Sequence, residues 1–186
     1  MVRWEPGAAG RLREAAMELY VERGFEQTTV AEIAQRAGVT ARTFFRHFAD
    51  KREVLFAGSE DLAGALMRAI VEAPAGAGPM AVVAAALDVG GGLLGQDRER
   101  SRHRQLIIRA NPELQERELI KLARLGDRLA EGLRARGIAP REAVLAAEAG
   151  ILVLRVAFES WVSGTDQGDL RVIMAETLAA LRTVTA

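Results

Sequence analysis

Apolar side chains recur every three or four positions along most of this 186-residue chain, the spacing that places them on one face of an α-helix. Capping residues, glycines and prolines divide the pattern into segments joined by short turns. Few runs favour strands, and alanine is abundant while aromatic residues are scarce. The sequence therefore predicts an all-α protein, with helices at residues 11–23, 30–36, 41–47, 51–72, 111–136, 140–163 and 169–183.

An almost wholly apolar segment begins at Pro79, which suits the first turn of a helix. Gly90, Gly91 and Gly92 stand together within it, and each glycine costs a helix about 1 kcal/mol relative to alanine. We therefore expect a break there. Either it makes space for a ligand or hinge, or it is a plain join between two short helices.

The clearest pattern lies between Thr28 and Lys51, where two short helices are joined by a tight turn. Thr29 and Glu32 have the spacing of a capping box, in which a hydroxyl and a carboxylate close the start of a helix. Gly38 permits the left-handed conformation that ends a helix. Thr40 directly precedes the second helix, and threonine is a good capping residue, so Thr40 is expected to cap the start of that helix.

The second helix, residues 41–47, is two-sided. Phe44 and Phe48 are four positions apart and are expected to pack inward. Five basic residues and one acid lie between Arg36 and Arg52, a net charge of +4. Arginine binds guanine bidentately in the major groove, and lysine neutralises phosphate. The outer face is therefore typical of a recognition helix, and it carries Arg42, Thr43, Arg46 and His47.

These residues resemble the tetracycline-repressor (TetR) family of bacterial transcription regulators. The resemblance covers about residues 12–56, and it is carried by Thr28-Thr29-Val30, Ile33-Ala34, Ala37-Gly38-Val39-Thr40, Thr43-Phe44-Phe45-Arg46-His47-Phe48 and Lys51. It implies a dimeric, all-helical protein. A three-helix helix-turn-helix DNA-binding domain with an N-terminal arm would occupy residues 1–50, and a helical ligand-binding and dimerisation domain residues 51–186. In the arm, Arg3 and Trp4 either touch DNA or belong to a disordered tail.

The resemblance also implies roles at the DNA. Arg42 and Thr43 would reach base edges, and Arg46 suits a base or a phosphate. The phosphate contacts are implied for Thr29, Thr40, His47 and Lys51. Phe45 departs from the family's pattern, which commonly has a tyrosine whose hydroxyl bonds phosphate. Phenylalanine is expected to keep the packing and to lose that bond.

The last two helices are apolar on more than one side, so they need a further surface to pack on. A second copy of the chain would supply it through a symmetric four-helix interface. The expected interface residues are Leu152, Val156, Trp161, Ile173, Leu178 and Leu181.

An apolar effector with few polar anchors is expected among Met67, Leu87, Leu94, His103, Ile107, Leu122, Arg155 and Phe158. For Arg155, a structural network with Glu148 and Glu159 is an equal alternative. The helix at residues 51–72 would carry the signal, bending at Gly58 and Gly64.

Composition narrows the function further. The 25 basic and 25 acidic residues balance, so any DNA-binding charge is local. No cysteine is present, which excludes disulfides and thiolate metal sites, and two histidines do not build a histidine-rich metal centre. The arginines at positions 98, 100, 102 and 104 alternate, which favours a solvated helix over a second nucleic-acid site.

Neither a phosphate-binding glycine loop nor a nucleophile elbow occurs, so we expect no enzyme, metal or cofactor. No stretch reaches the ~20 apolar residues of a membrane helix, and a cytoplasmic location is expected. The expected function is a ligand-responsive DNA-binding regulator, in this family most often a repressor. It would be released from its operator, double-stranded DNA, by a small apolar molecule whose identity the sequence does not show. The alternatives are an activator of the same fold and a non-enzymatic helical adaptor that binds no DNA.

Overall fold

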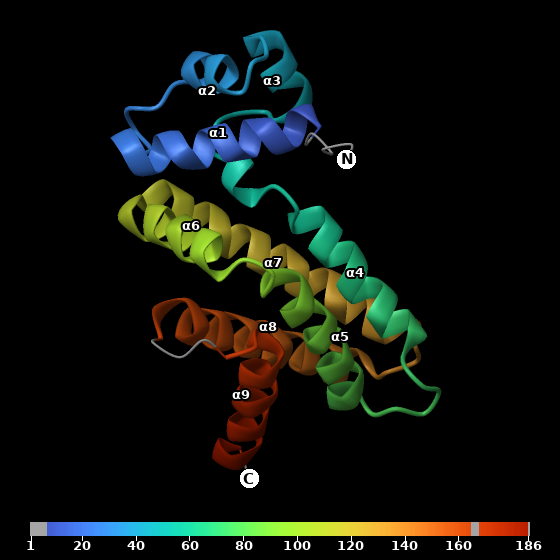
Figure 1. Cartoon of the computed structure of the whole chain (residues 1–186). Helices are drawn as coiled ribbons and strands as arrows, with labels where there is room; N and C mark the ends of the chain where they lie inside the picture. The colour runs from blue at the N-terminus through green and yellow to red at the C-terminus, as the bar shows by residue number, and fades with distance from the viewer. Residues whose placement is uncertain (1–6, 165–167, 186) are drawn as a thin grey trace, which may run out of the picture. The chain divides into compact units, whose positions relative to one another are not determined.

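The computed structural model describes residues 7–164 and 168–185. Within these ranges every regular element is a helix, so the all-α prediction is confirmed (Figure 1). Arg3 and Trp4 lie outside the described residues. No single described helix is long and apolar enough to cross a membrane, and one pair, α5 with α6, meets that test only as a bent pair. The elements are α1 (Ala8–Arg23), α2 (Val30–Arg36), α3 (Ala41–His47), η1 (Glu53–Phe56, a 3-10 helix), α4 (Ser59–Glu72), α5 (Pro79–Leu94), α6 (Arg98–Ala110), α7 (Pro112–Ala135), α8 (Pro140–Ser163) and α9 (Leu170–Val184).

The chain divides into two compact units. The first contains the residues up to Gly58 together with residues 103–118, and the second contains residues 59–102 and the chain from Leu119 onward. This division differs from the expected boundary at residue 50, and it falls within α6 and α7. The reason is packing, because three side chains from these helices are buried in the core of the first unit: Ile107, Ile108 and Leu114.

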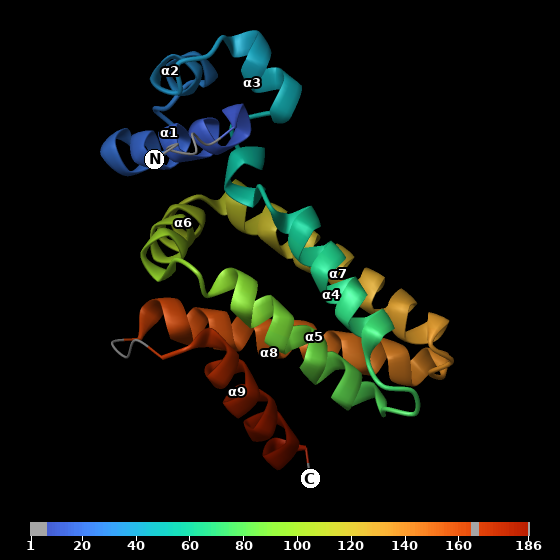
Figure 2. The same cartoon turned by 45° about the vertical axis from the view of Figure 1, so that its right-hand side comes forward.

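In the first unit, α1, α2 and α3 surround an apolar core. Figure 2 shows α2 and α3 joined by a short turn and lying together against α1. α1 contributes Leu12 and Leu19, and α3 contributes Phe44, which is completely buried. Tyr20 and Phe25 pack edge to face with ring centroids 5.2 Å apart. The three helices thus share one core, which leaves the outer face of α3 pointing away from it.

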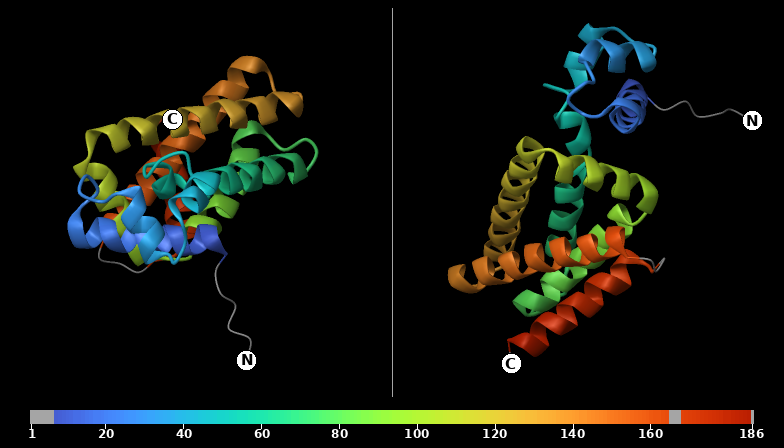
Figure 3. Two further views of the ribbon diagram at one scale, coloured as in Figure 1. Left: turned by 90° about the horizontal axis from the view of Figure 1, so that it is seen from above. Right: turned by 90° about the vertical axis from the view of Figure 1, so that its left-hand side faces the viewer.

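In the second unit, α5 packs against α4, α8 and α9 (Figure 3, right). Its apolar character is explained by this position, since neighbouring helices cover several of its sides. Six apolar side chains of this unit are completely buried: Ile70, Val82, Leu133, Ala143, Ala147 and Ala157.

The segment 51–72 is not one helix, so that prediction is wrong. η1 ends at Phe56, and α4 begins only at Ser59. Gly58 lies between them with φ of 90°, a conformation that residues with a Cβ rarely adopt. The buried side chains of η1 pack in the core of the first unit. This packing prevents η1 and α4 from forming one continuous helix. Gly58 is therefore a turn residue, and of the two expected flexure points only Gly64 lies within a helix.

The break predicted at the three glycines is also wrong, because α5 runs through Gly90, Gly91 and Gly92. A Cβ on Gly91 would lie 2.9 Å from Cγ and 3.1 Å from Cα of Arg171 in α9. A Cβ on Gly90 would lie 3.0 Å from Cδ2 of Leu66 in α4. These two glycines allow neighbouring helices to approach α5 closely, and the packing offsets their low helix propensity.

Candidate nucleic-acid interface

The helix-turn-helix begins with the predicted capping box, which is confirmed. The Thr29 Oγ1 accepts a hydrogen bond from the Glu32 backbone N–H at 3.3 Å. In return the Thr29 backbone N–H donates to Glu32 Oε2 at 2.8 Å. Two main-chain donors at the start of α2 are satisfied in this way, which stabilises a helix of only seven residues.

The turn into α3 follows the pattern that the sequence indicates. Gly38 has φ of 66°, in the left-handed region, and it directs the chain away from α2. Thr40 then caps α3, because its Oγ1 accepts a hydrogen bond from the Thr43 backbone N–H at 3.2 Å. Phe44 and Phe48 are both buried and hold the inner face of α3 on the core. The start and the orientation of α3 are therefore set by local contacts.

The outer face of α3 is exposed. Arg42, Phe45, Arg46 and His47 are all exposed, and Thr43 is half-buried. Neither Arg42 nor Arg46 has an acidic partner among residues 7–164 and 168–185. Two cations are thus presented without internal neutralisation. They suit hydrogen bonding to guanine edges or phosphate oxygens.

Other basic residues of this region are engaged inside the unit. Arg36 is bound to two carboxylates of α1, at 3.0 Å from Glu18 and 2.9 Å from Glu22. The hydrogen bonds that its guanidinium donates to Glu22 and Glu18 raise the pKa of Arg36 further above the ordinary value. Arg52 lies 3.2 Å from Asp50. The net charge of +4 that the sequence shows is therefore partly neutralised by folding, and α3 carries the charge that remains available.

Lys51 has a structural role that the sequence did not indicate. Its Nζ donates hydrogen bonds to the carbonyl oxygens of Phe25 at 2.8 Å, Glu26 at 3.1 Å and Thr28 at 3.1 Å. The ammonium also lies 4.4 Å from the centroid of the Phe25 ring. The Tyr20 hydroxyl donates to the Lys51 carbonyl at 2.6 Å. The three donors of the ammonium are thus used to close the turn between α1 and α2, so the expected phosphate contact has no donor left to make it.

Asp50, just after α3, is held in place by main-chain donors and arginines. Its Oδ1 accepts hydrogen bonds from the backbone N–H groups of Arg52 at 2.8 Å and Glu53 at 3.0 Å. Nη2 of Arg117, from α7, lies 3.8 Å from Oδ2. Burial by itself would raise the pKa of this carboxyl, but the hydrogen bonds and the two arginines outweigh burial and hold the pKa below its ordinary value.

The beginning of α7 makes two more ionic contacts with the segment after α3. Arg117 Nε donates to Glu53 Oε1 at 2.6 Å. Arg52 Nη1 donates to Glu113 Oε2 at 3.1 Å. Both contacts lie within the first unit. They tie the first turns of α7 to the segment that leads out of the recognition helix.

The part of α6 that belongs to the first unit contacts the same segment through Arg104. Its Nε donates to the Leu55 carbonyl at 2.7 Å, and its Nη1 donates to Glu118 Oε1 at 3.0 Å. The guanidinium carbon also lies 5.2 Å from the centroid of the Phe56 ring. Burial lowers the pKa of Arg104, and the Glu118 carboxylate opposes this effect. Arginine stays charged in proteins, so this is a half-buried ion pair that holds α6, α7 and η1 together.

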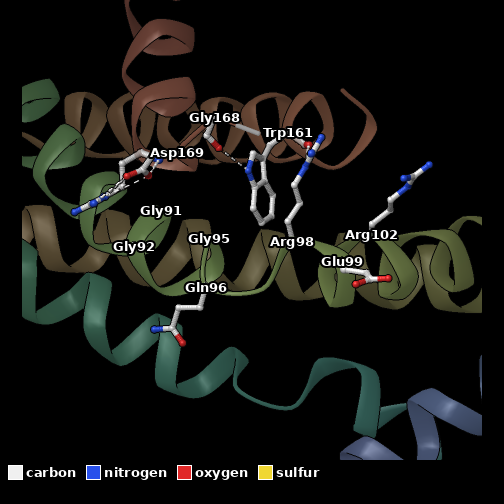
Figure 4. A pocket seen from close by; sticks show the side chains of 11 residues that line it. Gly91, Gly92, Gly95, Gln96, Arg98, Glu99, Arg102, Trp161, Gly168 and Asp169 are labelled. Atoms are coloured by element: carbon white, nitrogen blue, oxygen red, sulfur yellow. Dashed lines mark hydrogen bonds and ion pairs between the residues drawn. The ribbon is translucent and has the colours of Figure 1, made fainter. Parts of the chain in front are cut away.

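The second unit contains a cleft of about 670 Å³. Figure 4 shows Trp161 and Arg98 side by side, with Arg102 further along α6. Arg98 Nε donates to the Trp161 carbonyl at 2.8 Å, and its Nη2 contacts the Gly164 carbonyl. Arg102 has no ionic partner within the described part of the chain. The lining residues are Gly91, Gly92, Gly95, Gln96, Arg98, Glu99, Arg102, Trp161, Gly168, Asp169 and Arg171.

The residues expected to line an effector pocket do not line this cleft. Leu87 lies at a separate small cavity of about 10 Å³, and Ile107 is buried in the core of the first unit. Arg155 is exposed on α8, and His103 belongs to the first unit. Four residues are instead half-buried against the core of the second unit: Met67, Leu94, Leu122 and Phe158. No group of three acidic, histidine or cysteine side chains suited to a metal occurs among the described residues.

Two of the residues expected at a dimer interface are buried inside their own chain. Trp161 is 3% exposed and Leu178 is 5% exposed, and the Trp161 Nε1 donates to the Gly168 carbonyl at 3.0 Å. Their assignment to an interface is therefore wrong, because α8 and α9 cover them by packing on each other. Ile173 and Leu181 are half-buried against the same core, while Leu152 and Val156 are exposed.

Comparison with known proteins identifies the helix-turn-helix. Residues 12–57 match the family described as bacterial regulatory proteins, tetR family. The regulator TcmR of Streptomyces glaucescens is 40% identical over 76 residues, which are 41% of this chain and 34% of TcmR. This helix-turn-helix belongs to the TetR family. The match spans about a third of the length of this curated relative, so it supports the DNA-binding part most directly.

Solved structures of TetR-family regulators match along almost the whole chain. The repressor FadR of Thermus thermophilus, in complex with lauroyl-CoA, is 29% identical with a TM-score of 0.58, covering 93% of this chain and 92% of FadR. The FadR of Bacillus subtilis, in complex with stearoyl-CoA, is 26% identical with a TM-score of 0.59, covering 92% and 96%. The TetR-family architecture therefore extends through both units.

Several residues of this chain were not found by sequence reasoning. Arg104 and Arg117 brace the segment after α3, yet each lies more than 45 positions from its partner in η1. Arg102 and Arg171 line the same cleft from different helices. The sequence contains no local signal for such meetings, because the partners come together only when the helices pack.

Proposed function

We propose that this TetR-family protein is a ligand-responsive transcription regulator that binds double-stranded DNA as a homodimer, in the simplest case as a repressor. The observation that carries DNA binding is the exposed outer face of α3, on which Arg42 and Arg46 have no acidic partner in the described part of the chain. Such cations bind phosphates and guanine edges. The description of TcmR as a transcriptional regulator, and of the Thermus FadR as a repressor, supports the same role.

Dimerisation is supported by an exposed apolar stripe on α8. Leu145, Leu152 and Val156 are 62%, 39% and 45% exposed, and their spacings of seven and four place them on one face. On α9, Val172, Ala175 and Ala179 are exposed at spacings of three and four. Small side chains allow helices to approach closely. A symmetric four-helix interface between two copies would cover both faces.

The dimer is tested with two substitutions that differ only in where the leucine lies. Leu145→Arg should give a folded monomer, because it places a charge on the exposed stripe. Leu178→Arg should unfold the second unit instead, because Leu178 is 5% exposed within its own chain. Sedimentation velocity with circular dichroism separates the two results. A fully dimeric Leu145→Arg variant would place the interface elsewhere.

The effector is proposed to have a long apolar part and an anionic end. The two FadR relatives were solved with lauroyl-CoA and stearoyl-CoA. In this chain the cleft of the second unit is lined by Arg98, Arg102 and Arg171 against Glu99 and Asp169. Three arginines against two carboxylates favour the binding of an anionic group. Arg102 has no ionic partner among the described residues, so no carboxylate competes for it.

Control of DNA binding is proposed to run through α6 and α7. Each of these helices has residues in both units, and their ends in the first unit are bound to the segment after α3 through Arg104 and Arg117. A dimer must hold its two recognition helices about 34 Å apart to enter successive major grooves. An effector that binds better when this spacing is wrong lowers DNA affinity. A coupling of about 1–3 kcal/mol corresponds to a change of ~5- to 150-fold.

DNA binding is tested by selecting bound fragments from random duplexes and then measuring affinity against salt concentration. Arg42→Ala should weaken binding to the selected site by about 1–3 kcal/mol more than binding to random DNA, if the arginine reads a base. Arg182→Ala, which removes an exposed arginine from α9, is the matched control and should change neither. If Arg42→Ala weakened binding to the selected site and to random DNA equally, Arg42 would not be a base-reading residue. No retention of DNA at low salt would favour a helical adaptor over a regulator.

The effector is tested on the same selected DNA with stearoyl-CoA as the probe. Wild-type protein should be released, Arg102→Ala should need a higher concentration for half release, and Arg182→Ala should behave as wild type. Unchanged release from Arg102→Ala would show that the anionic end binds elsewhere. Reporter transcription in cells with and without the protein then distinguishes a repressor from an activator.

A further inference from the structure

Phe45 on the recognition helix is exposed in a way that its neighbours do not explain. It is 59% exposed, and within residues 7–164 and 168–185 no other phenylalanine, tyrosine or tryptophan is exposed to this degree. The ring touches Phe44 edge to face with centroids 5.5 Å apart. This contact holds one side of the ring, while Phe44 itself is completely buried. Phe45 therefore keeps a packing contact through Phe44, but it is not a core residue.

The position of Phe45 on α3 shows which face of the helix carries its exposed ring. At about 100° per residue, Phe45 lies ~60° to one side of Arg42 and Arg46 lies ~40° to the other. The three side chains thus occupy one arc of about 100°, the outer face of the helix. A single exposed apolar side chain needs no explanation on an ordinary surface. Here it lies on the surface that the proposed function assigns to the major groove.

We propose that Phe45 is a specificity-determining residue that reads the C5-methyl group of a thymine in the operator. The proposal rests on the proposed DNA-binding function. A phenyl ring has neither a donor nor an acceptor, so it gains nothing at a phosphate and reads no hydrogen-bonding edge. On base edges in the major groove, the thymine methyl is the apolar group that such a ring can contact.

The spacing on the helix also locates the thymine. Phe45 follows Arg42 by three residues, which is about 4.5 Å along the helix axis. One base-pair step is about 3.4 Å. The thymine read by Phe45 therefore lies within about two base pairs of the base pair whose discrimination depends on Arg42.

The experiment uses the full-length protein and the DNA site obtained by selection. Each thymine of the half-site is replaced in turn by deoxyuridine, which removes one methyl group and leaves the hydrogen-bonding pattern unchanged. Burying one methyl is worth a factor of about 4 in affinity. We expect one position per half-site at which deoxyuridine weakens wild-type binding about 4-fold, and about 16-fold when both half-sites are changed. In Phe45→Ala the same replacement should have no effect.

Two further measurements separate base reading from phosphate contact. Phe45→Ala should leave the salt dependence of binding unchanged, since the phenyl ring neutralises no phosphate. Phe45→Tyr adds a hydroxyl that can bond phosphate, so it should tighten binding on random DNA and on the selected site alike. The proposal is overturned if every deoxyuridine replacement is neutral in wild type, or if Phe45→Ala keeps the same deoxyuridine effect. Failure to select any DNA sequence would instead overturn the DNA-binding function itself.

Discussion

Replacing Lys51 by methionine tests whether this residue serves the fold or the DNA. Methionine keeps an unbranched side chain as far as the ε position and removes the ammonium. Three carbonyl oxygens then each lose one donor, those of Phe25, Glu26 and Thr28, while the Phe25 carbonyl keeps the Thr28 backbone N–H at 3.3 Å. The turn between α1 and α2 loses its closure, so we expect Lys51→Met to destabilise the first unit while the outer face of α3 stays intact.

The magnitude follows from the surroundings of the three hydrogen bonds. The bond to Glu26 is exposed, and water replaces it at little cost, whereas the bonds to Phe25 and Thr28 are partly buried. A hydrogen bond to a charged group contributes about 1.5–3 kcal/mol when buried, and we take the lower end for each of these two. The result is about 3 kcal/mol. At about 2–4 °C per kcal/mol for a protein of this size, the melting temperature should fall by roughly 6–12 °C.

The assay combines thermal unfolding, followed by circular dichroism, with DNA binding measured at several salt concentrations. Arg46→Met is the matched control, because it removes one positive charge from the exposed face of α3. It should leave the melting temperature nearly unchanged and lower the salt slope by about 0.9 for each phosphate that the arginine neutralises. Lys51→Met should show the reverse pattern. An unchanged melting temperature together with a reduced salt slope in Lys51→Met would refute the structural role and indicate that Lys51 contacts phosphate.

Three other changes test the fold at single positions. Thr29→Ala removes the hydroxyl of the capping box and should lower the free energy of unfolding by about 1 kcal/mol in urea titrations; no change would mean that α2 is held by packing alone. Gly91→Ala should cost about 1–3 kcal/mol, because the new Cβ meets the backbone of α9, whereas Gly92→Ala, with its nearest neighbour at 3.7 Å, should be neutral or stabilising. Equal melting temperatures for the two would contradict the close approach of α5 and α9. The lowered pKa of Asp50 means that its stabilising effect is present above the unfolded value of about 4 and is lost as the pH falls through the folded value. Asp50→Asn should therefore show a smaller fall in melting temperature than wild type between about pH 5 and pH 3.

Much of the recognition motif was determined by the sequence alone. The capping box of Thr29 and Glu32, the left-handed Gly38 and the burial of Phe44 all follow from patterns of residues at most four positions apart. Such patterns act within one helix or one turn, so spacing along the chain is enough to predict them. The same holds for the all-α class and for the positions of most helices.

The tertiary structure decided which charges remain available on the motif. Arg36 and Lys51 both belong to the basic run of the sequence, and Lys51 was expected to contact phosphate, but their partners lie 14 to 26 positions away in α1 and in the turn that follows it. Arg42 and Arg46 differ from them only in having no such partners among the described residues. Charge is a property of the residue, whereas its neutralisation depends on which carboxylates and carbonyls the fold brings near.

In the second unit, the sequence likewise did not show which apolar side chains are covered by their own chain. Periodicity correctly placed Trp161 and Leu178 on apolar faces, but their own neighbours cover them, and the exposed stripe is formed by Leu145, Leu152 and Val156. The glycines of α5 were expected to break a helix, and Gly91 instead lets Arg171 pack against it. A pattern of residues tells which face of a helix avoids water. Only the packed helices determine whether that face meets its own chain or is left for a partner.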